Sequence, residues 1–183
     1  MPDRLPNLTT ERLHLRAIAP TDVDFALAHF SHPDVDRFLV DDDPVTTRDQ
    51  AQAIVDFFVH VPEAFPNRWV LTLRDDGTPI GTVGFHVFRQ RDRRCEVGYD
   101  LSPQHWGRGY MSEALRAVLT LGFDVAHLNR VGAIVHPDNA GSLRLLERLG
   151  FTREGVLRDW HCRDGVFHDH VVLGLLAREW RSG

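Results

Sequence analysis

The opening third of the chain passes from a two-residue hydrophobic period to a helical one. Leu13, Leu15 and Ala17 alternate with His14, Arg16 and Ile18, which predicts a strand. From Thr21 onward the apolar residues recur at intervals of three or four, which predicts a helix with one buried face. The residues expected on that face are Val23, Ala26, Leu27 and Phe30.

A second helix is expected to begin near Thr47. Thr47 and Gln50 have the spacing of a capping box, in which each side chain bonds the other residue's backbone amide. Pro62 and Pro66 should end the helix, because proline lacks the amide hydrogen that a helix needs. The residues of its expected buried stripe are Ala51, Ile54, Val55 and Phe58.

The rest of the chain predicts strands, two further helices and a closing hairpin. Asp76-Gly77 and Asp164-Gly165 are typical hairpin turns, and Gly150 stands where a helix commonly stops. Since no repeat or linker interrupts the pattern, we expect an α+β fold with one mixed sheet and helices on its faces, in a single domain of residues 1–183. In chain order, the expected elements are strands over 68–74, 80–88 and 95–101, a helix over 107–123 with Met111, Ala114, Leu115 and Val118 inside, a strand over 131–136, a helix carrying Leu143, Leu146 and Leu149, and strands over 152–163 and 166–175.

Composition and charge narrow the class of protein. At 183 residues, with 43% hydrophobic and 26% charged residues, the chain suits one soluble globular domain. The formal charge of -5 disfavours nucleic acid as a partner, because binding phosphates requires a basic face, and it suits an amine-bearing substrate better. The charged amino terminus predicts no signal peptide, and no apolar run approaches the ~20 residues of a membrane-spanning helix. We therefore expect a cytoplasmic protein without a membrane partner.

The cysteines give no sign of a disulfide framework or a metal site. Cys95 and Cys162 lack paired spacing, so both are expected to be reduced, buried and inert. His168 and His170 share one face of a predicted strand, and His161 lies in the opposite arm of the hairpin. No metal is expected there, because no known ligand spacing accompanies them; surface histidines or the wall of a substrate cleft are the interpretations left open.

The segment from Gln104 to Gly109 joins a predicted strand to a predicted helix. Its glycines let the backbone turn tightly and approach a ligand closely. Free amides at the helix start, aided by Arg108, can bind an anion such as a phosphate. A simple glycine-rich turn is the alternative, since the segment lacks the third glycine of a dinucleotide motif and the ending of a P-loop.

Two segments together resemble the GNAT N-acetyltransferase superfamily. Gln104, Gly107 and Gly109 match its pyrophosphate-binding signature, and the companion segment runs from Asn139 to Phe151. The stretches Thr10–Arg16 and Gly98–Pro103 look like the branch that contains the ribosomal-protein alanine and serine N-terminal acetyltransferases. The resemblance extends from Thr10 to about Leu175.

This resemblance implies a three-layer α/β/α fold and a binding mode for acetyl-CoA as co-substrate. The sheet would be mostly antiparallel, with its fourth and fifth strands, over 95–101 and 131–136, splayed apart around acetyl-CoA. The pantetheine arm would pair with backbone near Tyr99 to Leu101, like an added strand, and the pyrophosphate would lie on loop and helix amides. The donor-binding residues implied are Tyr99, Leu101, Gln104, Trp106, Gly107, Arg108, Gly109, Tyr110, Met111, Ser112 and Asn139.

Glu96 and Ser142 are the catalytic candidates that the resemblance implies. Glu96 would be the base that takes a proton from the amine, with Asp100 on the same strand face as a lesser candidate. A solvent-facing strand glutamate is the alternative. Ser142 would donate to the departing thiolate, but Asn139 and Ser142 also have the spacing of a helix cap. A backbone N–H near Leu101 would stabilise the oxyanion.

The acceptor is the part that the sequence leaves open. The α-amine of a protein N-terminus is the leading hypothesis, and a homodimer is common among the proteins that the chain resembles. A small cationic amine such as a polyamine or an aminoglycoside is the alternative, which the acidic run Asp41-Asp42-Asp43 favours. A non-catalytic acyl-CoA-binding module is the third hypothesis. Trp69, Trp106, Phe85 and Phe123 are expected in the core or in a cleft wall.

Overall fold

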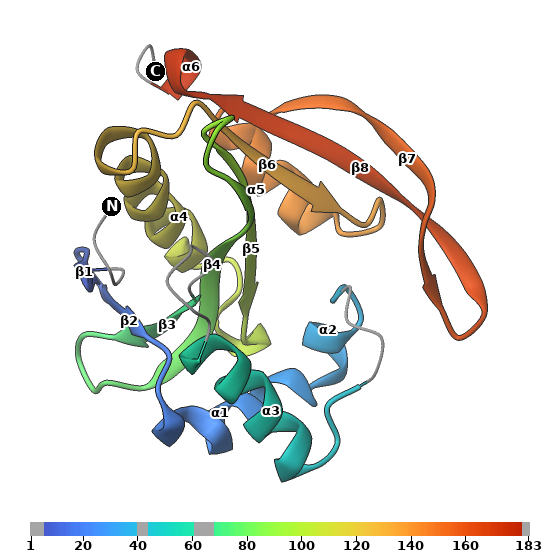
Figure 1. The fold of residues 1–183 in the computed structure, drawn as a ribbon. Coiled ribbons are helices and arrows are strands. Elements are labelled where there is room, and N and C mark those ends of the chain that lie inside the picture. Colours follow the sequence, from blue (N-terminus) through green and yellow to red (C-terminus); the bar gives the residue numbers. More distant parts are fainter. Residues whose placement is uncertain (1–5, 40–43, 61–67, 181–183) are drawn as a thin grey trace. The chain divides into compact units, whose positions relative to one another are not determined.

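The chain forms two compact units, which are described separately (Figure 1). The computed structural model describes residues 6–39, 44–60 and 68–180. The units consist of the described residues within Met1–His86 and Gly98–Val118 for the first, and within Val87–Val97 and Leu119–Gly183 for the second.

Within the described residues, eight strands form a mixed, mostly antiparallel sheet in the order β1-β2-β3-β4-β5-β6-β8-β7. Strands β4 and β5 each pass from one unit into the other, so neither unit is a continuous piece of chain. The strands are β1 (Leu8–Thr9), β2 (Leu13–Ala17), β3 (Arg68–Leu73), β4 (Pro79–Arg89), β5 (Arg94–Leu101), β6 (Arg130–Val135), β7 (Thr152–Arg163) and β8 (Val166–Leu176).

In the first unit, the helices α1 (Val23–Phe30), α2 (Pro33–Asp36) and α3 (Arg48–Val59) follow the first two strands. The capping box predicted for α3 is confirmed, since Thr47 Oγ1 accepts from the Gln50 amide and Gln50 Oε1 accepts from the Thr47 amide. Helix α2 was not predicted, because four residues are too few to show a helical period.

The strands of the first unit carry buried side chains on both faces. Val70 of β3 belongs to a cluster with the buried residues of the helices. Because side chains alternate along a strand, Leu71 and its cross-strand partner Leu15 lie on the opposite face. The buried members of the helical cluster are Ile18, Val23, Ala26, Phe30, Val35, Val45, Ala51, Val55 and Val70.

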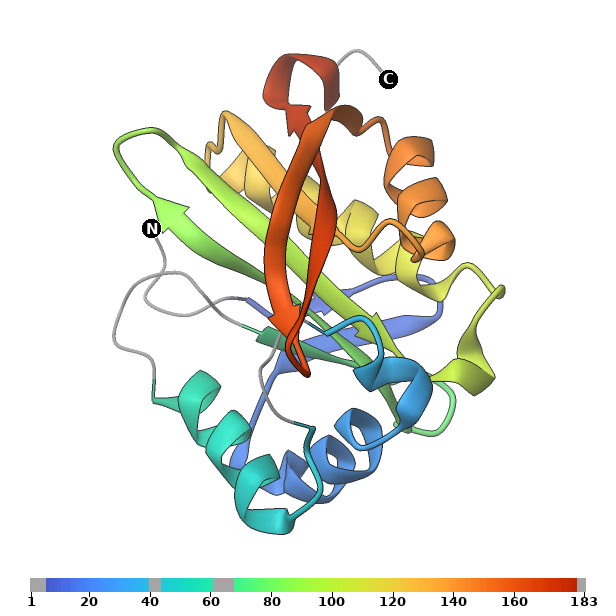
Figure 2. The ribbon, with the colours of Figure 1, turned by 90° about the vertical axis from the view of Figure 1, so that its right-hand side faces the viewer.

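In the second unit, β5 and β6 form the parallel pair and the other pairs are antiparallel (Figure 2). The parallel register joins Arg94–Glu96 to Arg130–Gly132, at the beginning of both strands. Strands β7 and β8 make a long hairpin. Its turn is the predicted one, with Asp164 at φ 53° and Gly165 at φ 76°, as a two-residue hairpin turn requires.

Helices α4 and α5 differ slightly from the prediction. Helix α4 (Tyr110–Thr120) begins three residues later than expected, and a π-helical turn over Leu121–Val125 continues it. Helix α5 (Ala140–Arg148) is followed by Gly150, whose φ of 93° is the left-handed form expected after a helix. A last short helix is α6 (Ala177–Trp180). No helix in the described part of the chain is long and apolar enough to cross a membrane.

Candidate active site

The loop from Gln104 to Gly109 leads into the first turn of α4. Gly107 has φ 72° and Gly109 has φ 83°, so both adopt the left-handed conformation that side chains disfavour. No described atom lies within 4 Å of a Cβ built at Gly107. The backbone conformation therefore requires glycine here, and it also explains why α4 begins at Tyr110 rather than at Gly107.

The start of α4 presents backbone amides that the helix does not use. The first intrahelical bond of this turn runs from the Glu113 amide to the Gly109 carbonyl, 3.0 Å away. The preceding amides, those of Tyr110, Met111 and Ser112, are of the kind that binds anions at a helix start. The Met111 side chain is buried in the core, so this residue can serve a ligand only through its backbone.

Trp106 is fixed across the end of β5. Its indole Nε1 donates a hydrogen bond to the Leu101 carbonyl at 2.6 Å, while about half of the residue is exposed, at 49%. Trp106 was expected in the core or in a cleft wall and does not lie in the core, whereas Trp69, Phe85 and Phe123 are buried as expected. Any strand-like pairing of a ligand with Leu101 has to share or avoid this carbonyl.

A buried polar network lies directly behind the end of β5. The Asp100 carboxylate accepts hydrogen bonds from the Thr82 amide at 2.9 Å, the Thr82 hydroxyl at 2.6 Å and His29 Nε2 at 2.7 Å, and it pairs with the Arg68 guanidinium. His29 Nδ1 lies 2.9 Å from the Ser102 hydroxyl. The network thus ties α1, β3 and β4 to the residues on both sides of Leu101.

This network excludes Asp100 as a base. Burial alone would raise the pKa of the Asp100 carboxyl, but the charge of Arg68 and the hydrogen bonds from His29 and Thr82 outweigh it and hold the pKa well below its ordinary value. Ser102, His29 and Asp100 also have the residue types of a hydrolase triad. Since Ser102 is buried, we assign the group a structural role in holding the end of β5.

Glu96 lies in the second unit, on the part of β5 that pairs with β6. It is half-buried, and its Cγ is 3.5 Å from the point where a Cβ at Gly132 would lie. The stem of the Glu96 side chain therefore lies beside Gly132 of β6. Neighbouring Cys95 is inert as predicted, because burial, together with the charge of Glu96, raises the pKa of its thiol to about 12.

Asn139 and Ser142 are joined at the start of α5. Asn139 Oδ1 accepts a hydrogen bond from the Ser142 amide at 3.1 Å, so the capping interpretation of Asn139 is confirmed. The cap uses the side-chain oxygen of Asn139 and leaves its amide nitrogen as the group that can address a ligand. The half-buried Ser142 hydroxyl takes no part in this cap bond.

Four histidines lie close together in the second unit, on β7, on β8 and directly after β6. The ring centroid of His136 lies 5.3 Å from that of His168 and 5.5 Å from that of His170, and the centroids of His161 and His170 are 6.1 Å apart. His170 is only 3% exposed, which corrects the expectation of a surface histidine, and burial lowers its pKa. His136 was missed, because it follows a different strand.

Other expectations have plainer outcomes. Within residues 6–39, 44–60 and 68–180, no group of three or more His, Cys, Asp or Glu side chains is arranged to hold a metal ion. Cys162 is exposed rather than buried, because β7 is exposed along most of its length. The acidic run Asp41-Asp42-Asp43 and the helix-ending Pro62 and Pro66 lie outside the described residues.

The chain matches a known protein family over most of its length. Residues 12–152 match the model of an acetyltransferase (GNAT) domain. The Bacillus subtilis (strain 168) protein called uncharacterized N-acetyltransferase YoaA is 37% identical over 171 residues, which cover 93% of this chain and 97% of the relative. The ribosomal protein uS5-alanine N-acetyltransferase of Escherichia coli (strain K12) is 36% identical over 110 residues, covering 60% of this chain and 57% of that one.

A solved structure shares the fold over nearly the whole chain. The GNAT-family acetyltransferase from Bacillus anthracis has a TM-score of 0.83 at 25% identity, and the match covers 95% of this chain and 100% of that chain. The fold therefore agrees with the family that residues 12–152 match.

Proposed function

Because this chain belongs to the GNAT acetyltransferase family, we propose that it transfers the acetyl group of acetyl-CoA to the α-amine of a protein N-terminus. The loop that precedes α4 is the observation that carries the donor half of this proposal. Gly107 and Gly109 are left-handed, Gly107 is open to approach, and both precede the unused amides of a helix of 11 residues. A diphosphate carries the charge that such amides bind best.

The first unit is proposed to hold the donor. Amides of Gln104–Ser112 would bind the pyrophosphate, with the exposed Arg108 guanidinium adding a charge-assisted hydrogen bond. Backbone of Tyr99–Leu101 would pair with the pantetheine arm, and a nearby N–H would stabilise the oxyanion of the thioester carbonyl. The buried Asp100 network supports this role, because it fixes the residues on both sides of Leu101.

The second unit is proposed to supply the proton-transfer groups. The amine nitrogen attacks the thioester carbon, the C–N bond forms, and the C–S bond breaks with release of the CoA thiolate. Glu96 would accept the proton that the nitrogen loses, directly or through water, and Ser142 would donate a hydrogen bond to the departing sulfur. Asn139 would bind the pantetheine arm through the amide nitrogen that its cap does not use.

The identity of the acceptor is argued from chemistry and from one relative. A peptide α-amine has a pKa near ~8 and a lysine amine near ~10.4, so the α-amine needs less help to lose its proton at neutral pH. The E. coli relative at 36% identity is named as an alanine N-acetyltransferase of a ribosomal protein, which supports the same choice. A cytoplasmic location and a homodimer stay predictions from the sequence.

The acceptor is tested by release of free thiol from acetyl-CoA. We expect release with a short lysine-free peptide that begins with alanine or serine, and none with the same peptide acetylated at its N-terminus. Release of thiol with spermidine and not with the peptide would overturn the choice of acceptor, but the protein would still be an acetyltransferase. Saturable binding of acetyl-CoA without release for any amine would favour the non-catalytic module.

Variants of the proton-transfer groups test the mechanism. We expect Glu96→Gln to lower kcat by about 100-fold, as loss of a general base commonly does, with binding of acetyl-CoA unchanged. Ser142→Ala should lower kcat less, because a thiolate is a good leaving group. If both variants turn over at the native rate, the assigned roles are wrong although the reaction stands.

A further inference from the structure

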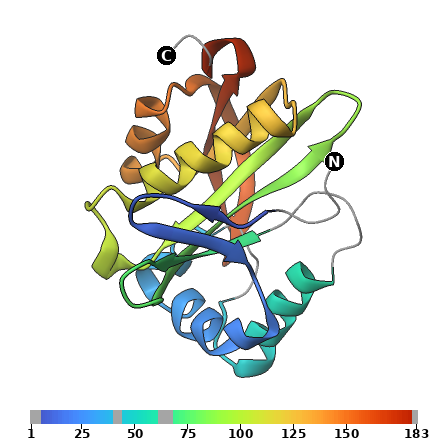
Figure 3. The same cartoon turned by 90° about the vertical axis from the view of Figure 1, so that its left-hand side faces the viewer.

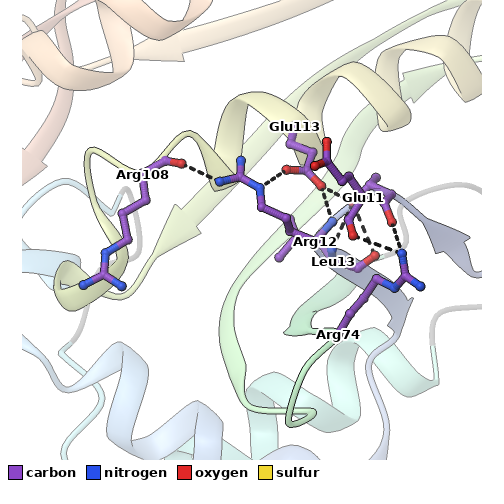
Figure 4. A network of polar contacts seen from close by, with 7 residues as sticks. Glu11, Arg12, Leu13, Arg74, Arg108 and Glu113 are labelled. Atoms are coloured by element: carbon purple, nitrogen blue, oxygen red, sulfur yellow. Dashed lines mark hydrogen bonds and ion pairs between the residues drawn. The ribbon is translucent and has the colours of Figure 1, made fainter.

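The motif Thr10-Glu11-Arg12-Leu13 contacts the start of α4 in the first unit (Figures 3 and 4). Glu113, in the first turn of α4, accepts hydrogen bonds at Oε1 from the Thr10 hydroxyl at 2.6 Å and from the Arg12 amide at 2.8 Å. Its Oε2 accepts from Arg12 Nε at 2.7 Å. The carboxylate is thus bound by donors that all come from one short stretch directly before β2.

The Arg12 guanidinium contacts the loop before α4 as well as Glu113. Its Nη1 donates to the Arg108 carbonyl at 2.9 Å, and its carbon lies 4.6 Å from the centre of the Tyr110 ring (Figure 4). If Gly109 carried a Cβ atom, the nearest described atom would be Arg12 Nη2, at 3.4 Å. One side chain therefore contacts Arg108 and Tyr110, the residues on both sides of Gly109.

The contact between Arg12 and the loop restricts the loop before a ligand binds. A loop with glycines in the left-handed region, Gly107 and Gly109, has many alternative conformations when it is free, and ordering it on binding costs entropy. A hydrogen bond to the Arg108 carbonyl and packing on Tyr110 restrict those conformations in advance. Restricting a binding loop in advance raises affinity for its ligand.

The Arg12–Glu113 ion pair also offsets the repulsion between Glu113 and an anion bound at the start of α4. A carboxylate in the first turn of α4 competes with a bound anion for the positive end of the helix. Burial raises the pKa of Glu113, but hydrogen bonds from Thr10 and Arg12 outweigh this and lower it, so the group is ionised. At 17% exposure its charge is only partly screened by water, and Arg12 neutralises it at a distance of 2.7 Å.

We propose that Arg12 and Glu113 are positioning residues for the donor: they hold the Arg108–Tyr110 loop ready for the CoA pyrophosphate, and Arg12 cancels the charge of Glu113 beside it. This inference rests on the proposed function of the loop. It assigns a role to the Thr10–Arg16 motif, which the proposed chemistry did not use. It also predicts that loss of Arg12 weakens CoA binding more than loss of Glu113. Loss of Arg12 leaves the Glu113 carboxylate near the anion without a counter-charge, and loss of Glu113 does not.

The test is calorimetric titration with CoA at fixed pH and ionic strength. We expect Arg12→Gln to weaken CoA binding by about tenfold or more, and Glu113→Gln to weaken it less. The double variant Arg12→Gln/Glu113→Gln should bind CoA more tightly than Arg12→Gln, because it removes the bare carboxylate. Arg12→Lys, which keeps the charge and loses the fork geometry, should lie between the native protein and Arg12→Gln.

Arg74→Gln is the matched control. Arg74 also donates to this stretch, to the carbonyls of Thr10 and Glu11 at 3.1 and 3.0 Å, and these bonds leave the Arg108–Tyr110 loop untouched (Figure 4). In turnover, Arg12→Gln should raise KM for acetyl-CoA and leave KM for the amine unchanged, a split that general loss of stability does not produce.

The outcomes separate the two levels of the inference. Native protein that does not bind CoA would overturn the proposed function of the loop, and the positioning role with it. Native binding of CoA with Arg12→Gln binding as tightly as Arg74→Gln would overturn only the positioning role. A double variant that binds no better than Arg12→Gln would refute the charge-cancelling part.

Discussion

Asp100 carries a negative charge in the interior of the first unit, where hydrogen bonds and Arg68 replace solvation. Its carboxylate pairs with Arg68 and accepts hydrogen bonds from His29 and Thr82, and these partners come from three different elements. Removing one member of such a group leaves the others buried without a counter-charge, which costs far more than the loss of a surface ion pair.

We therefore expect Asp100→Asn to lower the free energy of unfolding by about 3–5 kcal/mol, measured by urea denaturation at pH 7. Asp92→Asn is the control, because Asp92 pairs with Arg94 at 3.7 Å on the surface and should change stability little. Because the pKa of Asp100 is lowered on folding, its contribution is complete above the ordinary carboxyl pKa of about 4 and is lost as pH falls through the folded value. A difference between variant and native protein that stays constant into acid would contradict this assignment.

Two substitutions of Asn139 can distinguish its role as a helix cap from its proposed role in binding the donor. Asn139→Ala should lower stability by about 1 kcal/mol through loss of the cap to the Ser142 amide, measured by denaturation. Asn139→Ser keeps a capping oxygen and loses the amide nitrogen, so it should keep the stability and weaken binding of acetyl-CoA. If Asn139→Ser binds acetyl-CoA like the native protein, Asn139 is a cap and has no part in the donor site.

At the scale of elements, the hydrophobic period predicted most helices and strands of the chain. The exceptions have local causes: β1 has two residues and α2 has four, which is too short for a period, and left-handed glycines delay α4 to Tyr110. The loop before α4 could be predicted because its chemistry lies in consecutive backbone groups. The Asp100 and Arg12 networks could not, because they join residues 71 and 101 positions apart, whose meeting depends on strand register and helix packing.

The four neighbouring histidines of the second unit, His136, His161, His168 and His170, are expected to make its stability depend on pH. Burial is the main cause of the lowered pKa of His170, and His136, His161 and His168 add to it, whereas a hydrogen bond to His168 backbone opposes it. The unfolded chain therefore binds more protons than the folded one below the ordinary histidine pKa of about 6.5, so stability falls as pH drops through that value.

Denaturation of the native protein at pH 7.5 and pH 5.5, compared with His170→Leu, tests this expectation. The variant should lose less stability between the two conditions, because it lacks the group that resists protonation. His127→Leu is the control, since His127 is exposed and has no ring partner among the described histidines of the hairpin. An equal loss in native protein and His170→Leu would show that His170 does not determine the effect.

At the scale of the whole molecule, each of the two units is built from two separate stretches of the chain. Strands β4 and β5 each contribute residues to both units, so unfolding one unit removes strand pairing from the other. We therefore expect one cooperative thermal transition, with equal calorimetric and van't Hoff enthalpies, as for a single domain. Two resolved transitions in scanning calorimetry would contradict the single-domain prediction.

Binding of the donor is the claim on which the other functional assignments depend. The most direct measurement is calorimetric titration of acetyl-CoA into the native protein, into Gly107→Glu/Gly109→Glu, and into the control Gly165→Glu. Gly165 has a φ of 76° and, like Gly107, no described atom within 4 Å of an added Cβ, so the control places one such glutamate, with its strain and charge, away from the donor loop. The account predicts saturable binding by the native protein and the control, and none by the folded loop variant. Absence of binding by the native protein at millimolar acetyl-CoA, or equal binding by the loop variant, would contradict it.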